Sequence, residues 1–202
     1  MSAPASQAAG QRQQKHAGEK TKVLFVCLGN ICRSPSAEAV FKTVVDRAGV
    51  TDAFHIDSCG TGGGSRNWYQ PGGFAYHVGD PADPRMNQAA KARGIALTSR
   101  SRPLRPEDLV DYDLIIGMDS ANVAEIQVAA DFWASQHDIP TNYREKVKLM
   151  CSFLTSNKFK GALEVPDPYY GGKAGFERVL DLLEDACEGL LATIQDGNGH
   201  GS

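Results

Sequence analysis

The residues of this chain whose types and spacing could perform chemistry are concentrated at positions 27–34, in the stretch CLGNICRS. Cys27 offers a thiol, Arg33 offers a planar guanidinium with five residues between them, and Ser34 offers a hydroxyl. A thiolate is a strong nucleophile, and a guanidinium can bind two oxygens of a phosphate at once. The pattern therefore predicts a loop in which Cys27 attacks a phosphoryl group that Arg33 holds.

The residues between Cys27 and Arg33 are suited to forming a cradle for an anion. Backbone amides of a turn that leads into a helix can point toward a common centre and bind negative charge. Gly29 and Asn30 are residue types that tolerate the left-handed backbone that such a turn requires. We expect the amides and the guanidinium to favour the thiolate form of Cys27 as well.

Other interpretations of Cys27 and Cys32 are weaker. A zinc site would need a second Cys or His pair at ligand spacing, and the five histidines are scattered, so we predict no metal. A thioredoxin-like redox pair has two residues between its cysteines, whereas four intervene here. A plain strand-to-helix turn with two packing cysteines remains the alternative, but it leaves the glycine, asparagine, arginine and serine of the same turn without a reason.

The segments around this loop predict alternating strands and helices. Apolar runs typical of buried strands occur at residues 21–28, 54–60, 111–119 and 147–150. Patterns typical of helices occur at residues 34–49, 84–94, 120–130 and 174–194. We therefore expect an α/β fold: a single domain with a four-stranded parallel open sheet flanked by helices, which is a three-layer, doubly wound arrangement.

The order of these elements should bring the reactive residues to one edge of the sheet. We expect Ser34 to cap the first helix, with Pro35 at its first position and Gly49 at its end. Open α/β sheets bind ligands beyond the carboxyl ends of their strands. The 27–34 loop follows the first strand and Asp119 ends the third, so both should lie there. For Asp119, a helix N-cap role is a better interpretation than chemistry.

Length, charge and composition narrow the classes of function. A chain of 202 residues, 42% of them hydrophobic, suits one domain, which we predict at residues 21–196 between disordered tails at 1–20 and 197–202. The net charge of −3 argues against nucleic-acid binding, and no apolar run approaches the roughly 20 residues that cross a bilayer. The first tail lacks the apolar segment of a secretory signal. Five cysteines in such a chain are expected to be reduced, which favours the cytoplasm and leaves organellar targeting by the tail open.

A resemblance to a known family follows from longer stretches of the sequence. VLFVCLGNICRSPSAEAVF resembles the signature of the low-molecular-weight protein tyrosine phosphatases, and IDSCGT, DPADPRM, GIALTSRSRPL, DLIIGMDSANV and VPDPYYGG extend the likeness over residues 22–195. The resemblance implies a four-stranded parallel α/β fold without a metal or another cofactor. It also implies hydrolysis of phosphotyrosine in proteins, and of small aryl phosphates, with inorganic phosphate as product and no nucleic acid or membrane as partner.

The resemblance also implies roles for the residues of the loop. Cys27 would become a phosphocysteine, and Ser34 would donate a hydrogen bond to its thiolate. Asn30 would be held in a strained backbone conformation by hydrogen bonds, including one with Ser58. The Arg33 side chain would bind the phosphoryl group together with the backbone amides of Leu28, Gly29, Asn30, Ile31, Cys32 and Arg33.

A general acid is also needed, because a phenolate leaves more readily if it is protonated as its bond breaks. Three aspartates precede a proline: Asp80, Asp83 and Asp167. We interpret Asp80 and Asp83 as turn residues. Asp167 matches the family's acid, which would also activate water in the second step.

Further residues match the family's pattern around the loop. Tyr169 and Tyr170 match aromatic residues that wall the substrate cleft. Cys32 matches a second cysteine that would trap oxidised Cys27 as a disulfide.

The segment at residues 61–79 departs from the family pattern, because it is several residues longer. Either Trp68 or Tyr76 could form the aromatic wall there, and Tyr76, directly before HVG, aligns better. Ser99 stands where some relatives place a histidine that is bonded to the loop asparagine, so this support should differ here.

Three rival functions can be weighed from the sequence. Arsenate reductases share the fold but use two further cysteines close together, whereas Cys151 and Cys187 are far apart in sequence. Protein-arginine phosphatases typically have threonine at the position of Ile31, and an apolar residue favours a flat aromatic substrate. A phosphotyrosine-binding module without activity would not need Cys27, Arg33 and Asp167 together.

Overall fold

Four parallel strands form the centre of the computed structural model, which describes residues 19–169 and 171–198. The strands are β1 (Thr21–Cys27), β2 (Phe54–Gly60), β3 (Leu114–Gly117) and β4 (Val147–Leu149). Their order in the sheet is β2-β1-β3-β4, and every neighbouring pair is parallel. This is the predicted four-stranded sheet, with β1 inside it and β2 at its edge.

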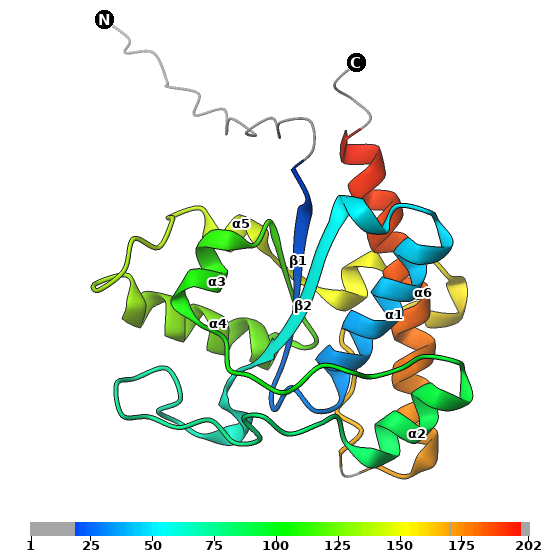
Figure 1. Ribbon diagram of the computed structural model, residues 1–202, viewed down its shortest axis with the longest axis horizontal. Helices are drawn as coiled ribbons and strands as arrows, with labels where there is room; N and C mark the ends of the chain where they lie inside the picture. The colour runs from blue at the N-terminus through cyan, green and yellow to red at the C-terminus, as the bar shows by residue number, and fades with distance from the viewer. Residues whose placement is uncertain (1–18, 170, 199–202) are drawn as a thin grey trace, which may run out of the picture.

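Helices cover both faces of the sheet, as predicted, with α1, α2 and α6 on one side and α3, α4 and α5 on the other (Figure 1). The α-helices are α1 (Arg33–Arg47), α2 (Pro84–Ala92), α3 (Pro106–Asp111), α4 (Ser120–Trp133), α5 (Tyr143–Lys146) and α6 (Lys173–Asn198). Short 3₁₀ helices occur at η1 (Thr51–Ala53), η2 (Gly62–Gly64), η3 (Met150–Phe153) and η4 (Asn157–Phe159).

The central strand β1 carries core residues on both of its faces. Val23 and Phe25 pack in the cluster that contains α1 and α6, whereas Leu24 and Val26 pack in the cluster that contains α4. All four side chains are fully buried. Successive side chains of a strand point to opposite faces, so a continuous apolar run is what a strand covered on both sides requires. The buried side chains of β1 anchor this strand in the core, and the 27–34 loop starts at its last residue, Cys27.

The first helix begins two residues earlier than predicted, at Arg33 rather than at Pro35. Ser34 is not its N-cap: α1 starts at Arg33, with Cys32 at the cap position and no capping bond from a side chain. The Ser34 hydroxyl lies instead against the sulfur of Cys27 and the carbonyl of Cys59 in β2, so it does not cap the helix. The helix ends at Arg47, and Gly49 follows in the left-handed conformation, as predicted.

The apolar run predicted as a strand at 111–119 is only partly a strand. The strand is limited to β3, and Asp111, the first residue of the predicted strand, is the last residue of α3, a helix that was not predicted. Pro106 occupies the first turn of α3, and the Asp108 carboxylate accepts a hydrogen bond from the Arg105 amide in a capping box. Capping and proline at the first position favour a helix there despite the short length.

The long 61–79 segment is anchored to α4 by aromatic contacts. Trp68 packs edge-to-face on Trp133, with ring centroids 5.8 Å apart. The Trp68 indole donates to Glu125, and the Trp133 indole donates to the carbonyl of Tyr69. Both tryptophans are buried. Because Trp68 lies in this core contact, it is not placed as a wall of the loop.

The two ends of the chain lie almost entirely outside the described residues. Of the predicted tails at 1–20 and 197–202, residues 1–18 and 199–202 lie outside the described residues. Helix α6 continues to Asn198, two residues beyond the predicted domain limit at 196. Among the residues that the structure describes, no helix is both long and apolar enough to span a bilayer.

Candidate active site

The 27–34 loop connects β1 to α1 at the carboxyl edge of the sheet. Asp119 follows β3 at the same edge, and Asp167 lies in the segment between η4 and α6. Arg33 contacts both aspartates, which are 86 and 134 residues away in sequence. The fold thus brings together the residues that the sequence pattern separated widely.

Cys27 is enclosed at the base of the loop. Its side chain is 3% exposed, and the Ser34 hydroxyl lies 3.0 Å from its sulfur and 3.1 Å from the carbonyl of Cys59. A hydroxyl that donates to sulfur stabilises a thiolate more than a thiol. The backbone is held here as well, because the Thr61 amide donates to the carbonyl of Cys27 and the Met118 amide donates to that of Val26. Cys27 therefore has a defined position, with a hydroxyl donor at its sulfur.

Asn30 holds the turn of the loop in a left-handed conformation, with φ of +54°, whereas Gly29 does not adopt positive φ. Its side-chain nitrogen donates to the hydroxyls of Ser34 and Ser58, each at 2.9 Å. The Ser58 hydroxyl donates in turn to Glu38. The predicted bond with Ser58 is present, and these contacts compensate the cost of positive φ at a residue other than glycine.

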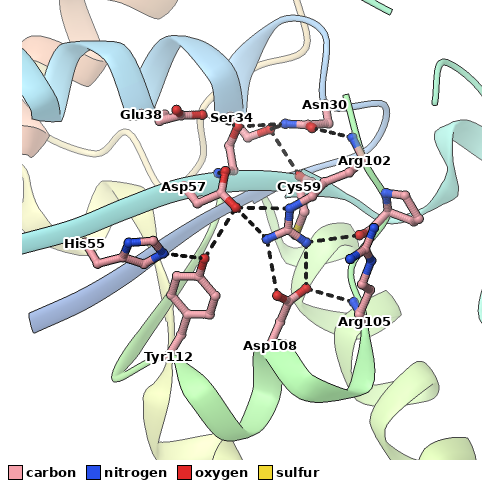
Figure 2. A network of polar contacts seen from close by, with 12 residues as sticks. Asn30, Ser34, Glu38, His55, Asp57, Cys59, Arg102, Arg105, Asp108 and Tyr112 are labelled. Atoms are coloured by element: carbon pink, nitrogen blue, oxygen red, sulfur yellow. Dashed lines mark hydrogen bonds and ion pairs between the residues drawn. The ribbon is translucent and has the colours of Figure 1, made fainter. Parts of the chain in front are cut away.

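The third hydrogen bond of the Asn30 side chain comes from Arg102, a support for the loop that we did not predict from the sequence. The side-chain oxygen of Asn30 accepts from the backbone amide of Arg102 (Figure 2). The neighbouring Ser101 hydroxyl donates to the carbonyl of Gly29. Gly60 lies between the two: its amide donates to the carbonyl of Arg102, and a Cβ on it would lie 2.8 Å from the carbonyl oxygen of Leu28 in the loop. The loop is thus supported from behind by backbone and side-chain donors rather than by a histidine at position 99.

The Arg102 side chain fixes that supporting segment. Figure 2 shows the guanidinium between Asp57 and Asp108, to each of which it donates two hydrogen bonds. Burial opposes its charge, but the bond to Asp108 and the neighbouring negative charges outweigh burial and raise the pKa of Arg102. The Tyr112 hydroxyl lies within 3.3 Å of Asp57 and of His55. Sequence reasoning missed Arg102, because its partners come from β2 and α3.

Arg33 is buried, at 3% exposure, and its guanidinium joins three parts of the site. One nitrogen donates to Asp119 and to the carbonyl of Val165, and the other donates to Asp167 at 2.9 Å. Burial opposes its charge, but the charge of Cys27 and the bond to Asp119 outweigh burial and raise the pKa of Arg33. Asp119 is the predicted N-cap of α4, accepting from the Asn122 amide, and it has the additional, unpredicted contact with Arg33.

Asp167 lies at the surface beside this guanidinium. Its side chain is 40% exposed; one oxygen accepts from Arg33 and the other accepts from the backbone amide of Tyr169. Tyr169 is 38% exposed at the same edge. Tyr170, the other predicted wall residue, lies outside the described residues. The Asp167 carboxylate is therefore accessible and oriented by two donors.

Asp83 and Arg85 connect the 27–34 loop to the segment that carries Asp167. The Asp83 amide donates to the carbonyl of Ile31, and its carboxylate caps α2 by accepting from the Arg85 amide. The Arg85 guanidinium donates to Asp83 and also to the carbonyl of Tyr169, at 3.0 Å. Asp83 is thus a helix cap as well as the predicted turn residue, and the role of Arg85 was missed although it lies within the recognised stretch DPADPRM.

The aromatic residues beside the loop come from the 61–79 segment. Tyr76 is 50% exposed and packs edge-to-face on Phe74, with ring centroids 4.9 Å apart. Its amide donates to the carbonyl of Gly62, and the Gly63 amide donates to the carbonyl of Leu28, so one short turn links Tyr76 to the loop. Leu28, 38% exposed, lies on the open side of the loop. This placement favours Tyr76 over buried Trp68 as the wall.

The other cysteines differ from Cys27 in their surroundings. Burial, followed by the charge of Asp83, raises the pKa of the Cys32 thiol. Burial also raises the pKa of Cys151 to about 11, and it raises the pKa values of Cys59 and Cys187. All five cysteines are free. In the part of the chain that the structure describes, no group of three His, Cys, Asp or Glu residues could hold a metal ion.

Comparisons with known proteins agree on one family. The sequence model of the family described as low molecular weight phosphotyrosine protein phosphatase matches residues 22–198. A phosphatase of that name from Schizosaccharomyces pombe is 39% identical over 174 residues, which are 86% of this chain and 96% of the relative.

Solved structures give the same result. A crystal structure of a protein tyrosine phosphatase from Entamoeba histolytica, with Hepes in its active site, is 42% identical and superposes with a TM-score of 0.74 over 88% of this chain and 99% of that one. A Drosophila arginine phosphatase is 30% identical, with a TM-score of 0.69 over 87% of this chain and 98% of that one.

Proposed function

The chain belongs to the low molecular weight phosphotyrosine protein phosphatase family, and from this premise we propose that it hydrolyses phosphotyrosine in proteins through a phosphocysteine on Cys27. As a member of the family, it is a hydrolase of phosphomonoesters that acts on phosphoproteins. What supports the proposal is the arrangement around Arg33, which donates to the Asp167 carboxylate at 2.9 Å and belongs to the same loop as Cys27.

In the first step, the Cys27 thiolate attacks phosphorus, and the bond between phosphorus and the phenolic oxygen breaks. The backbone amides of residues 28–33 and the Arg33 guanidinium bind the three phosphoryl oxygens as charge shifts onto them. Asp167 gives its proton to the departing phenolic oxygen, so that a neutral phenol leaves. Attack and protonation require the two groups on opposite sides of the phosphoryl group.

The contact between Arg33 and Asp167 changes with the substrate in this mechanism. A phosphate dianion is the stronger partner for the guanidinium, because it offers two oxygens to the planar fork. Once Arg33 binds phosphate, Asp167 is released to hold a proton next to the leaving group. Asp119, on the other nitrogen of Arg33, keeps the guanidinium oriented through the exchange.

In the second step, a water molecule replaces the phenol. Asp167, now a carboxylate, takes a proton from the water as its oxygen attacks phosphorus, and the bond between sulfur and phosphorus breaks. Inorganic phosphate leaves, and the Ser34 hydroxyl stabilises the returning thiolate of Cys27. The same residues thus serve both steps, and neither step consumes a cofactor.

The walls of the site favour a flat aromatic leaving group. We assign Tyr76, Tyr169 and Tyr170 to the walls, and the apolar side chains of Leu28 and Ile31 to the rim of the loop. The exposure of Tyr76, Tyr169 and Leu28 around one edge supports this assignment. An aromatic ring packs favourably between such side chains, and the phosphoryl group then reaches the amides at the base.

We assign Cys32 a protective role for Cys27. Oxidation of a reactive thiolate to a sulfenic acid can be arrested by a neighbouring thiol, which forms a disulfide and releases water. The position of Cys32 within the same loop supports this. The chemistry needs a thiolate nucleophile, which a reducing compartment preserves, so we propose the cytoplasm as the place of action.

A panel of phosphorylated peptides tests the substrate class. Peptides of one sequence that contain phosphotyrosine, phosphoserine or phosphoarginine are compared by phosphate release, and the phosphotyrosine peptide is expected to be cleaved at least about 100-fold faster by kcat/KM. The arginine phosphatase among the similar structures makes phosphoarginine the second candidate. Faster release from phosphoarginine would replace the proposed substrate, and equal rates on all three would defeat the assignment.

A further inference from the structure

Arg85, in the first turn of α2, bridges the 27–34 loop and the segment that carries Asp167. On the loop side, it donates from the side chain to both oxygens of Asp83, at 3.0 and 2.7 Å, and Asp83 binds the carbonyl of Ile31 through its amide. On the other side, its remaining nitrogen donates to the carbonyl of Tyr169 at 3.0 Å. The Arg85 guanidinium therefore binds Asp83 and the carbonyl of Tyr169 at the same time.

Aromatic rings restrict the guanidinium further. Its central carbon lies 5.2 Å from the ring centroid of Tyr169 and 5.0 Å from that of Phe176, a buried residue of α6. Cation–π contacts at these distances add to the hydrogen bonds, and a planar guanidinium can make both kinds of contact together. Arg85 is thus held in one orientation although its side chain is 49% exposed.

The contact with Tyr169 is only two residues from the proposed acid. The Tyr169 amide donates to one oxygen of Asp167, so the peptide groups on both sides of Tyr169 are engaged, one by Asp167 and one by Arg85. The other oxygen of Asp167 is bonded to Arg33, a contact that the proposed mechanism gives up when phosphate binds. At that stage, the turn at Tyr169 has to keep Asp167 in place.

We infer that Arg85 is a positioning residue for the general acid, which fixes the Asp167 turn relative to the 27–34 loop. The inference rests on the acid role of Asp167 in the proposed function. Arg85 does not touch the phosphoryl group in this arrangement; it acts through the carbonyl of Tyr169. A displacement of the acid by about 1 Å is enough to slow proton transfer substantially.

The dependence of rate on the leaving group separates positioning from a merely structural role. Protonation matters most for phenols that are poor leaving groups, and kcat/KM reports the steps up to loss of the phenol. Arg85→Ala is measured on aryl phosphates from p-nitrophenyl phosphate to phenyl phosphate. We expect a loss of roughly 10-fold on phenyl phosphate and of less than about 3-fold on p-nitrophenyl phosphate.

Matched variants make the result specific. Lys91→Ala removes an exposed positive charge from the same helix and is expected to leave both rates unchanged. Arg85→Lys keeps the charge but not the planar fork, and it should recover part of the phenyl phosphate rate. Asp167→Asn should give a steeper dependence on the leaving group than Arg85→Ala does.

The double variant tests whether Arg85 acts through the acid. If it does, adding Arg85→Ala to Asp167→Asn makes the dependence no steeper than Asp167→Asn alone. An equal loss on every substrate, or none, in Arg85→Ala would overturn the inference while Asp167→Asn still steepens the dependence. If Asp167→Asn does not steepen it, the acid in the proposed function is wrong, and the inference falls with it.

Discussion

The two sides of the 27–34 loop are built differently. On the buried side, Asn30, Ser34 and Ser58 are at most 2% exposed and are joined to Arg102 by hydrogen bonds. On the acid side, the side chains of Asp167 and Arg85 are 40% and 49% exposed. We refer to these groups as the buried side and the acid side. The buried side is a hydrogen-bond network shielded from solvent, whereas the contacts of the acid side lie at the surface.

The difference follows from what each side has to do. In the proposed mechanism, the loop amides keep the same positions in both chemical steps, and a buried network with few alternative partners provides that stability. In the same mechanism, Asp167 first binds Arg33, then faces a leaving group and then faces water, and these steps require an exchange of partners near solvent. Rigidity behind the nucleophile and accessibility around the acid are thus complementary.

Removing the nucleophile is expected to have the largest effect. Cys27→Ser replaces a thiolate with a hydroxyl that is far less nucleophilic, and hydrolysis of p-nitrophenyl phosphate should fall by at least about 1,000-fold. Cys151→Ser, another buried thiol, serves as the matched control and should retain most of the activity. Substantial turnover by Cys27→Ser would contradict the proposed mechanism.

Breaking the buried side at Asn30 is expected to have the next largest effect. Asn30→Ala removes three hydrogen bonds and leaves a left-handed residue without its compensation, so kcat should fall roughly 10- to 100-fold. Asn30→Gly accepts positive φ without strain and isolates the hydrogen bonds. If both variants kept the wild-type kcat, the network would not be what holds the loop.

Arg102 should affect stability more than the matched arginine on the acid side. Arg102→Ala leaves Asp57 and Asp108 without their shared cation, and the free energy of unfolding in urea should fall by about 1–3 kcal/mol. Arg85→Ala should leave the urea midpoint nearly unchanged, because that side chain is half exposed. Arg100→Ala, an exposed neighbour, is the control. Equal destabilisation by Arg102→Ala and Arg85→Ala would contradict the distinction between a rigid buried side and an exposed acid side.

The smallest effect is expected from the charge of Asp83. Hydrogen bonds from Arg85 hold the pKa of Asp83 below its ordinary value, so its ionised form favours the folded state. This contribution is present above the unfolded pKa of about 3.9 and is lost as pH falls through the lower folded pKa. Asp83→Asn keeps a good helix cap and should lower Tm by no more than about 2 °C at pH 7, a difference that shrinks toward about pH 3. A difference that grew on acidification would reverse the sign of this linkage.

The sequence predicted the parts of the site that are local. The 27–34 loop could be derived because the nucleophile, the amides and the guanidinium all lie within one turn, and periodicity predicted the sheet around it. Asp167 could be selected from three Asp-Pro pairs only through the family resemblance. The prediction that Ser34 caps the first helix was wrong, because the Ser34 hydroxyl binds the sulfur of Cys27 instead. Local capping preferences do not take such a partner into account.

The supporting arginines could not be predicted for the same reason. Arg102 and Arg85 each bind groups from other elements, and their position in the sequence near Asp or Pro indicates only a turn or a helix start. The placement of Trp68 was open because an aromatic residue in a long loop fits a wall and a core contact equally well in sequence. The packing on Trp133 decides between them.

The contact between Trp68 and Trp133 gives the protein an intrinsic fluorescence probe of the 61–79 segment. These are its only two tryptophans, and both lie where the 61–79 segment meets α4. Fluorescence excited selectively at tryptophan therefore reports on this one junction, whereas far-ultraviolet dichroism reports on the helices and the sheet. The segment that carries Tyr76 can therefore be followed by tryptophan emission, without any added label, while phosphorylated ligands are titrated.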